Sequence, residues 1–254
     1  DVKYILDFLS SKERELHISD TQHTHQILDM NVVNSLCIFG SNNQQDAHET
    51  LLKILNIIHK LTETNPFPDL LLSQNTSGYT NSVINDTFYG MLITNYTCNS
   101  CKLFTTVSTT FCEVEISVGG DVQGGIMRTF SDTLVKFCQN CNINTSHSVN
   151  TRISQQPCIT IVRVNRFVQS ESGRLHKNTA QVLCNKLVTL PDFKAQLIGL
   201  IFHKGQSTSS GHYTSLVNAN DIWYLCDDSK VTTVDFNKFC ISSHVYILFY
   251  KSVV

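Results

Sequence analysis

Two short cysteine repeats are the residues whose type and spacing indicate chemistry most clearly. Cys98 and Cys101 enclose two residues, and Cys138 and Cys141 enclose two more. A Cys-x-x-Cys turn directs both sulfur atoms at one ion, and two such turns complete the tetrahedral four-sulfur shell that suits zinc. Four protein ligands leave no coordination position for substrate or water, so we expect one structural zinc ion per chain.

A histidine and an aspartate form the second candidate group. His212 opens a predicted strand after a run of small polar residues, and Asp227 and Asp228 follow the strand that holds Trp223. Two neighbouring antiparallel strands would bring the imidazole beside the carboxylate, which is the base and orienting partner of a nucleophilic triad. On spacing alone, a structural histidine remains the alternative.

The remaining cysteines have no partner at metal-ligand spacing. We interpret them as small apolar residues in or near the core; they are Cys37, Cys112, Cys158, Cys184, Cys226 and Cys240. The chain is long enough to build a core without disulfides, and its start lacks a secretory signal. We therefore expect a reducing compartment, the cytoplasm and/or the nucleus.

The hydrophobic pattern places helices first and strands afterwards. Apolar spacing predicts helices over 2–16 and 45–61, and residues 62–82 read as loop. From about residue 83 the sequence predicts short strands: 111–118, 159–167, 196–203, 212–217, 222–225 and 245–250. Glycines 119, 120, 124 and 125 predict a turn or flexible loop. This order favours an α+β fold over a doubly wound sheet.

Charge and hydropathy argue against two classes of partner. The net charge is −2 at pH 7, whereas a nucleic-acid binder normally carries a basic face. No apolar run approaches the roughly 20 residues of a membrane span. We expect neither nucleic acid nor membrane as a partner.

Taken together, the motifs resemble the catalytic domain of ubiquitin-specific proteases, in order, over residues 27–251. The motifs that carry the resemblance are Gln44–Glu49, the four paired cysteines, Asn165-Arg166-Phe167, Lys177-Asn178, His203-x-Gly205, Gly211-His212-Tyr213, Trp223, Asp227-Asp228-Ser229, Val231 and Tyr246–Tyr250. Thr50 and Asn165 replace the family's usual Phe and Lys. The stretch between the cysteine pairs is short for the family, which leaves the choice between ubiquitin and a ubiquitin-like modifier open.

The resemblance implies a fold and a set of roles. The fold would be papain-like, with a helical thumb (1–82), zinc-ribbon β fingers (83–150) and an antiparallel β palm (151–254). His212 would be the general base, Asp227 its orienting partner and Asp228 a supporting polar residue. Gln44 and Asp46 would lie near the cleft that holds the ubiquitin tail. The implied reaction is hydrolysis, through a thioester, of the bond after the terminal glycine of ubiquitin.

The family's nucleophile is missing from this sequence. No Asn-x-Cys-x-x-Asn-Ser box is present, and residues 1–36 contain no cysteine. Because the sequence starts without methionine and inside a helical pattern, we expect the cysteine a short way upstream. Three alternatives stay open: an inactive relative that binds ubiquitin or a ubiquitin-like modifier or acts as a scaffold, a nucleophilic Cys37, and a zinc-ribbon protein that recognises nucleic acid.

Overall fold

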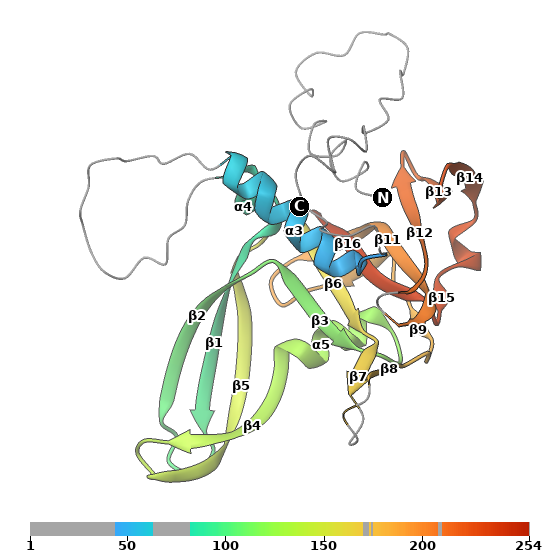
Figure 1. Ribbon diagram of the computed structural model, residues 1–254. Helices are drawn as coiled ribbons and strands as arrows, with labels where there is room; N and C mark the ends of the chain where they lie inside the picture. Colours follow the sequence, from blue (N-terminus) through green and yellow to red (C-terminus); the bar gives the residue numbers. More distant parts are fainter. Residues whose placement is uncertain (1–43, 63–81, 170–172, 174, 208–209, 254) are drawn as a thin grey trace.

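The computed structural model describes residues 44–62, 82–169, 173, 175–207 and 210–253. Within these residues the chain runs from helices into strands, and Figure 1 shows two sheets with a helix lying across them. The predicted helix over 2–16, the loop over 63–81 and Cys37 lie outside the described residues. None of the described helices is both long and apolar enough to span a bilayer.

Helix α3 (Ala47–Thr62) is the helix predicted over 45–61. It begins where it does because the Asp46 carboxylate accepts hydrogen bonds from the backbone N–H groups of His48 (2.9 Å) and Glu49 (3.0 Å). Its buried Leu51 and Leu55 pack with residues of the following helix and of the main sheet. The prediction of this helix is confirmed.

A short helix stands where the sequence predicted the start of the strand region. Helix α4 (Val83–Phe88) is capped by Ser82, whose hydroxyl accepts a hydrogen bond from the backbone N–H of Asn85 at 3.1 Å. Ile84 and Phe88 are buried against α3. The cap and the burial of these two side chains favour the helical turn over an extended conformation.

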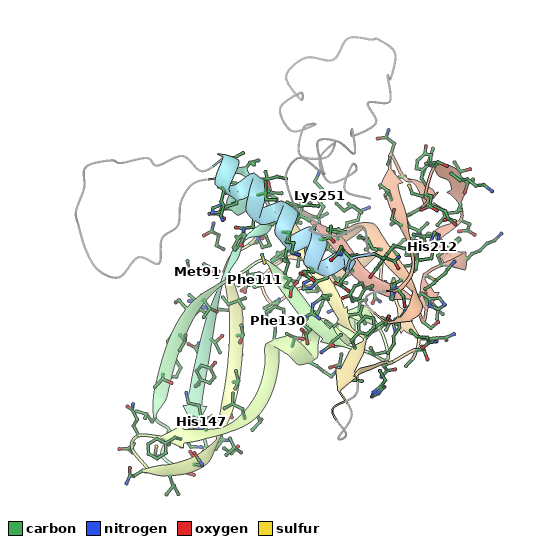
Figure 2. All side chains as sticks on the ribbon, in the orientation of Figure 1. Met91, Phe111, Phe130, His147, His212 and Lys251 are labelled. Atoms are coloured by element: carbon green, nitrogen blue, oxygen red, sulfur yellow. The ribbon has the colours of Figure 1, made fainter. Side chains whose placement is uncertain are left out.

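The first sheet is four-stranded and antiparallel, in the order β2-β1-β5-β4. Its strands are β1 (Gly90–Cys98), β2 (Phe104–Phe111), β4 (Ser131–Cys138) and β5 (Ile143–Gln155). Figure 1 shows this sheet reaching away from the rest of the molecule, and Figure 2 labels His147, the strand neighbour of Cys98, near its far end. We call this sheet the fingers. Both cysteine pairs lie at its far end.

The second sheet has eight strands in the order β14-β13-β12-β11-β16-β6-β3, with β10 added beside β11. Its strands are β3 (Glu113–Ser117), β6 (Ile159–Asn165), β10 (Leu187–Thr189), β11 (Lys194–Ser207), β12 (Ser210–Ala219), β13 (Ile222–Asp227), β14 (Lys230–Val234) and β16 (Val245–Val253). All pairs are antiparallel except β3 with β6. Each predicted strand from 159 onward falls on one of these strands, and 111–118 contains β3.

Smaller elements complete the described structure. Two-stranded sheets join β7 (Phe167–Gln169) to β8 (Leu175–Lys177) and β9 (Val182–Leu183) to β15 (Ile241–Ser242), and a 3₁₀ turn covers Phe236–Lys238. The range 83–150, expected as fingers, is shared between the sheets, because β3 lies within it and joins the eight-stranded sheet.

Part of the predicted glycine loop is wrong, because Gly124 and Gly125 lie in helix α5 (Val122–Phe130). The Asp121 carboxylate caps this helix by accepting a hydrogen bond from the Gly124 backbone N–H at 2.7 Å. A Cβ at Gly125 would lie 3.0 Å from Cβ of Ile116, so glycine lets the helix approach β3 closely. Tertiary packing therefore outweighs the low helix propensity of glycine.

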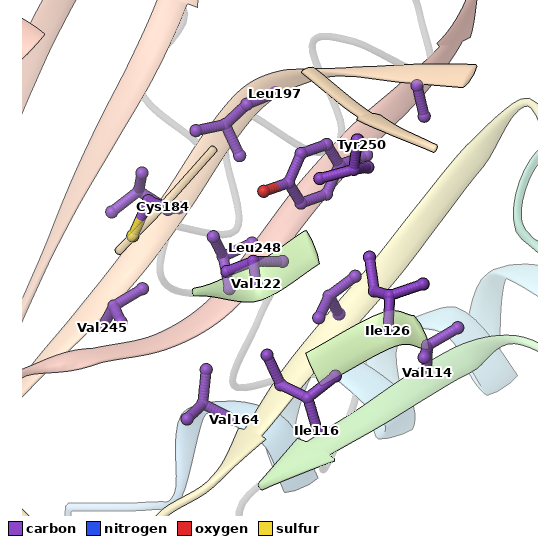
Figure 3. Packing of buried hydrophobic residues seen from close by; sticks show 14 of the residues in the cluster. Val114, Ile116, Val122, Ile126, Val164, Cys184, Leu197, Val245, Leu248 and Tyr250 are labelled. Carbon is purple, nitrogen blue, oxygen red and sulfur yellow. The ribbon is translucent and has the colours of Figure 1, made fainter. Parts of the chain in front are cut away.

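The main core lies between α5 and the eight-stranded sheet. Val122 and Ile126 of the helix are fully buried among residues of β3, β6 and β16 (Figure 3). Leu248 and Tyr250, two positions apart on β16, both face this core. The adjacent Ile247 belongs to the smaller cluster under α3. A sheet covered on both faces gives a rigid platform for the strands that carry the candidate site.

Candidate active site and metal centre

His212 and Asp227 are brought together by the pairing of β12 with β13. The antiparallel register pairs Ser215 with Cys226, so the start of β12 lies beside the end of β13. The Nε2 atom of His212 lies 2.5 Å from the Asp227 carboxylate, and the two side chains are 43% and 44% exposed. A neutral imidazole that donates from Nε2 keeps Nδ1 as its proton acceptor. The predicted juxtaposition is present, and both side chains are accessible to solvent; Figure 2 labels His212.

Asp228 lies in the turn between β13 and β14. The strands pair Asp227 with Lys230, and the exposed Asp228 adopts a left-handed conformation with φ of 49°. One of its carboxylate oxygens lies within 4.8 Å of the facing atoms of His212 and Asp227. Its charge therefore adds to the negative field around the imidazole.

Gln44 lies directly beside the predicted base. Its side-chain amide donates to the carbonyl of Gly211 at 2.6 Å and accepts from the backbone N–H of the same residue at 2.8 Å. Gly211 immediately precedes His212.

Asp46 is occupied by contacts within the protein. Besides capping α3, its carboxylate accepts the hydroxyl hydrogen bond of Tyr246 at 2.9 Å. Burial, together with the negative charge of Asp46, raises the pKa of Tyr246 well above its usual range. The Asp46 carboxylate thus accepts hydrogen bonds from three residues, His48, Glu49 and Tyr246.

The four paired cysteines converge at the end of the fingers. The sulfur atoms of Cys98 and Cys141 are 3.9 Å apart, those of Cys101 and Cys138 are 3.5 Å apart, and all four lie within 4.8 Å of one another. A tetrahedral zinc ion with Zn–S bonds of about 2.3 Å would place its sulfur ligands about 3.8 Å apart. The donor set therefore fits a metal ion of this size and geometry.

The two cysteine turns have the same backbone design. Lys102 and Asn142, each directly after the second cysteine of its pair, both have positive φ, 63° and 55°. Their backbone N–H groups donate to the carbonyls of Cys98 (2.9 Å) and Cys138 (2.8 Å). This repeat within one site is typical of paired metal-binding turns.

The thiols of the cluster influence one another's ionisation. Hydrogen bonds from the Cys101 backbone and the Thr145 hydroxyl lower the pKa of Cys98 to about 5, whereas the hydrogen bond with Cys101 raises the pKa of Cys141 to about 12. Cys101 thus disfavours ionisation of Cys141. A divalent cation at the centre would stabilise four thiolates together.

Comparison with known proteins identifies the family. The family model described as ubiquitin carboxyl-terminal hydrolase matches residues 19–250. The chain belongs to the ubiquitin carboxyl-terminal hydrolase family. It is 26% identical over 237 residues to ubiquitin carboxyl-terminal hydrolase 23 of Arabidopsis thaliana, covering 86% of this chain and 27% of that protein. It is also 26% identical to ubiquitin carboxyl-terminal hydrolase 4 of the same plant, covering 85% of this chain and 72% of the relative.

Solved structures show the same fold. The SAGA DUB module containing Ubp8, Sgf11, Sus1 and Sgf73 and bound to monoubiquitin matches with a TM-score of 0.70 and 21% identity, covering 88% of this chain and 51% of that chain. The module bound to ubiquitin aldehyde matches with a TM-score of 0.68, covering 89% of this chain and 52% of that chain. The α+β, papain-like fold of the ubiquitin-specific proteases is therefore confirmed. The 254-residue chain spans about half the length of these chains.

Lys177 and His203 form a part of the site that sequence reasoning missed. The Lys177 ammonium donates to the carbonyls of His203 (2.5 Å) and Gly205 (3.0 Å) and to Nδ1 of His203 (3.1 Å). Both side chains are buried, and the His203 ring stacks on Tyr213, the neighbour of His212, at 4.6 Å. Both residues belong to motifs that carry the resemblance. Their spacing in the sequence, however, does not predict that the end of β8 contacts the end of β11.

The buried ammonium predicts a pH dependence of stability in this hydrolase domain. Burial, followed by the nearby charge of Arg166, lowers the pKa of Lys177 from 10.5 to about 8. Above pH 8 the folded state releases this proton before the unfolded state does, so stability rises with pH and the gain is lost as pH falls through 8. Lys177→Met removes the titrating ammonium group and with it this pH dependence. Because solvent screens part of this effect, urea unfolding should show the wild type gaining on the order of 1 kcal/mol over the variant between pH 8 and pH 10. A stability difference that stays constant over this range would contradict the assignment.

Proposed function

We propose that this domain is the catalytic domain of a thiol-dependent deubiquitinase, which hydrolyses the bond after the C-terminal glycine of ubiquitin. Membership of the family supports the reaction class. The observation that carries the proposal is the 2.5 Å contact between Nε2 of His212 and the Asp227 carboxylate, because it orients a solvent-accessible imidazole that can act as a base.

In the proposed mechanism His212 accepts a proton and gives it up again in each of two steps. Asp227 accepts the Nε2–H bond, so Nδ1 takes the proton of a cysteine thiol, and the thiolate attacks the terminal carbonyl of ubiquitin. The amine of the leaving group departs with the proton from His212 and leaves a thioester. His212 then takes a proton from water, and the water oxygen attacks the thioester carbonyl. The carbon–sulfur bond breaks, His212 returns its proton to the sulfur to restore the thiol, and the new carboxyl group of ubiquitin loses its proton to solvent.

We propose that the nucleophile is a cysteine outside these 254 residues. Cys226 is adjacent to Asp227 but buried, and successive side chains of a strand point to opposite faces of the sheet. The buried Cys184 packs in the main core. Cys37 is the second candidate and lies outside the described residues.

We propose that the cluster of Cys98, Cys101, Cys138 and Cys141 holds one structural zinc ion. The fingers need such a ligand because their strands bury few apolar side chains, and β2 is exposed over Phe104–Thr110. A metal bound to both turns would supply the cohesion that a hydrophobic core supplies elsewhere.

Ubiquitin is the proposed partner, with a ubiquitin-like modifier as the other candidate ligand, and the cytoplasm and/or nucleus is the proposed location. The SAGA DUB modules that share the fold are described with ubiquitin bound. An inactive relative that binds ubiquitin is the second candidate function, because residues 1–36 contain no cysteine.

Turnover of a ubiquitin C-terminal amide tests the proposal. A full-length protein with the family's cysteine box ahead of this sequence should release a fluorescent amine from the ubiquitin substrate. The 254-residue chain should bind ubiquitin but release no amine. If the full-length protein binds ubiquitin and releases no amine, the inactive relative is the correct reading.

A further inference from the structure

Gln44 and Gly211 form a clamp beside the candidate base. The two residues are 167 positions apart in the sequence, yet one side-chain amide satisfies both the N–H and the C=O of Gly211. Two hydrogen bonds to one residue restrict its rotation as well as its position. The peptide so held leads directly into His212.

The strand ladder leaves Gly211 available for this clamp. The register pairs Lys204 with His212 and then shifts to pair Ser207 with Ser210, so Gly211 has no strand partner. Irregular pairing of this kind commonly re-aims a side chain next to an active site.

The other side of Gly211 is closed by His203. Gly211 has φ of 152°, and a Cβ there would lie 2.4 Å from Nε2 of His203 and 2.6 Å from the carbonyl of Lys204. Glycine is therefore required at position 211. A glycine backbone, however, has more conformational freedom than that of any other residue. Contact with His203 on one side and Gln44 on the other removes that freedom.

Gln44 is itself fixed by the start of α3. Asp46 holds Tyr246 at 2.9 Å, and the backbone N–H of Ala47 donates to the hydroxyl of Tyr213 at 3.4 Å. The helix start is thus attached to β16 and β12, and Gln44 reaches Gly211 from an anchored segment.

We propose that Gln44 is a positioning residue that acts through Gly211 to hold the His212 imidazole with Nε2 facing Asp227. The inference deepens the proposed function, on which it rests, because the orientation matters to catalysis only if His212 is the base. A base displaced by about 1 Å can lose about 10²-fold in rate.

A second clamp in the same chain provides a matched control. Gln123 of α5 donates to the carbonyl of Thr189 at 2.9 Å and accepts from its backbone N–H at 2.7 Å. Thr189 pairs with Lys194 and His212 pairs with Lys204, both on β11. At about 3.3 Å per residue, ten residues of strand separate the two clamps by about 33 Å.

The test is NMR on the 254-residue chain, which needs no nucleophile. Gln44→Ala should accelerate hydrogen exchange of the Gly211 amide by about fivefold or more, since it removes one hydrogen bond. It should also shift the imidazole ¹⁵N resonances of His212 away from the Nε2–H tautomer. Gln44→Glu keeps an acceptor for the Gly211 N–H but loses the donor to its carbonyl, so it should shift His212 while protecting the Gly211 amide. Gln123→Ala should accelerate exchange at Thr189 and leave His212 unchanged.

Two results would overturn the proposal. One is unchanged exchange at Gly211 in Gln44→Ala, which would mean that the clamp does not form in solution. The other is accelerated exchange with His212 resonances identical to those of the wild type, which would make Gln44 a local structural residue. Neither result depends on turnover, so a failure here is distinct from a failure of the proposed function. In an active full-length protein, Gln44→Ala should lower kcat with KM unchanged.

Discussion

His212→Ala should reduce turnover of a ubiquitin C-terminal amide by about 10³-fold or more in the full-length protein. The imidazole is the only group that Asp227 orients through a hydrogen bond among the described residues, so its loss removes the base for both proton transfers. Ubiquitin affinity should change little, because the variant removes a catalytic group and leaves the sheet intact. Steady-state kinetics and binding by calorimetry measure the two quantities.

His176→Ala is the matched control for this variant. His176 lies on β8 and is exposed, so its loss should leave turnover unchanged. Asp227→Asn should cause a smaller loss than His212→Ala, since an asparagine carbonyl still accepts from Nε2. Unchanged turnover in His212→Ala would show that another residue is the base.

Loss of one metal-site thiol should have the second largest effect, confined to the fingers. Cys138→Ala removes a buried ligand whose sulfur lies 3.5 Å from that of Cys101. Elemental analysis should find about one zinc per wild-type chain and almost none in the variant. Hydrogen exchange should show β1, β2, β4 and β5 losing protection while the eight-stranded sheet keeps it, because the described strands of the fingers bury few apolar side chains.

Cys240→Ser is the control variant, because it removes a thiol that lies outside the four-cysteine cluster. Cys240 is partly buried and its sulfur contacts the carbonyl of Asn237 at 3.3 Å, far along the chain from the cluster. Its variant should keep the zinc. A wild-type domain that is folded throughout without zinc would contradict the structural role of the cluster.

The sequence predicted those features whose signals are local. Apolar periodicity located α3, and alternating residues located β3. The Cys-x-x-Cys pairs anticipated the convergence of the four cysteines, because each turn carries its geometry within four residues. The His212–Asp227 contact was also predictable, since only fifteen residues separate the partners across one hairpin.

Features set by distant contacts were not predictable in this way. The Gln44–Gly211 clamp joins the start of a helix to a strand 167 positions later, and the Lys177–His203 contact joins β8 to the end of β11. Helix α5 was missed because its glycines indicate a turn locally, whereas close packing on Ile116 requires one of them within a helix. In each case tertiary packing supplies the deciding energy.

The most direct test of the proposed chemistry uses ubiquitin with a thiol-reactive group at its C-terminus. The full-length protein and the 254-residue chain would each be incubated with it, and intact mass and peptide mapping would locate any adduct. We expect one adduct on the full-length protein, at a cysteine preceding Asp1, and none on the 254-residue chain. Absence of an adduct on both, with ubiquitin still bound, would contradict the assignment of a thiol protease, and an adduct on the chain at Cys37 would contradict the proposed source of the nucleophile.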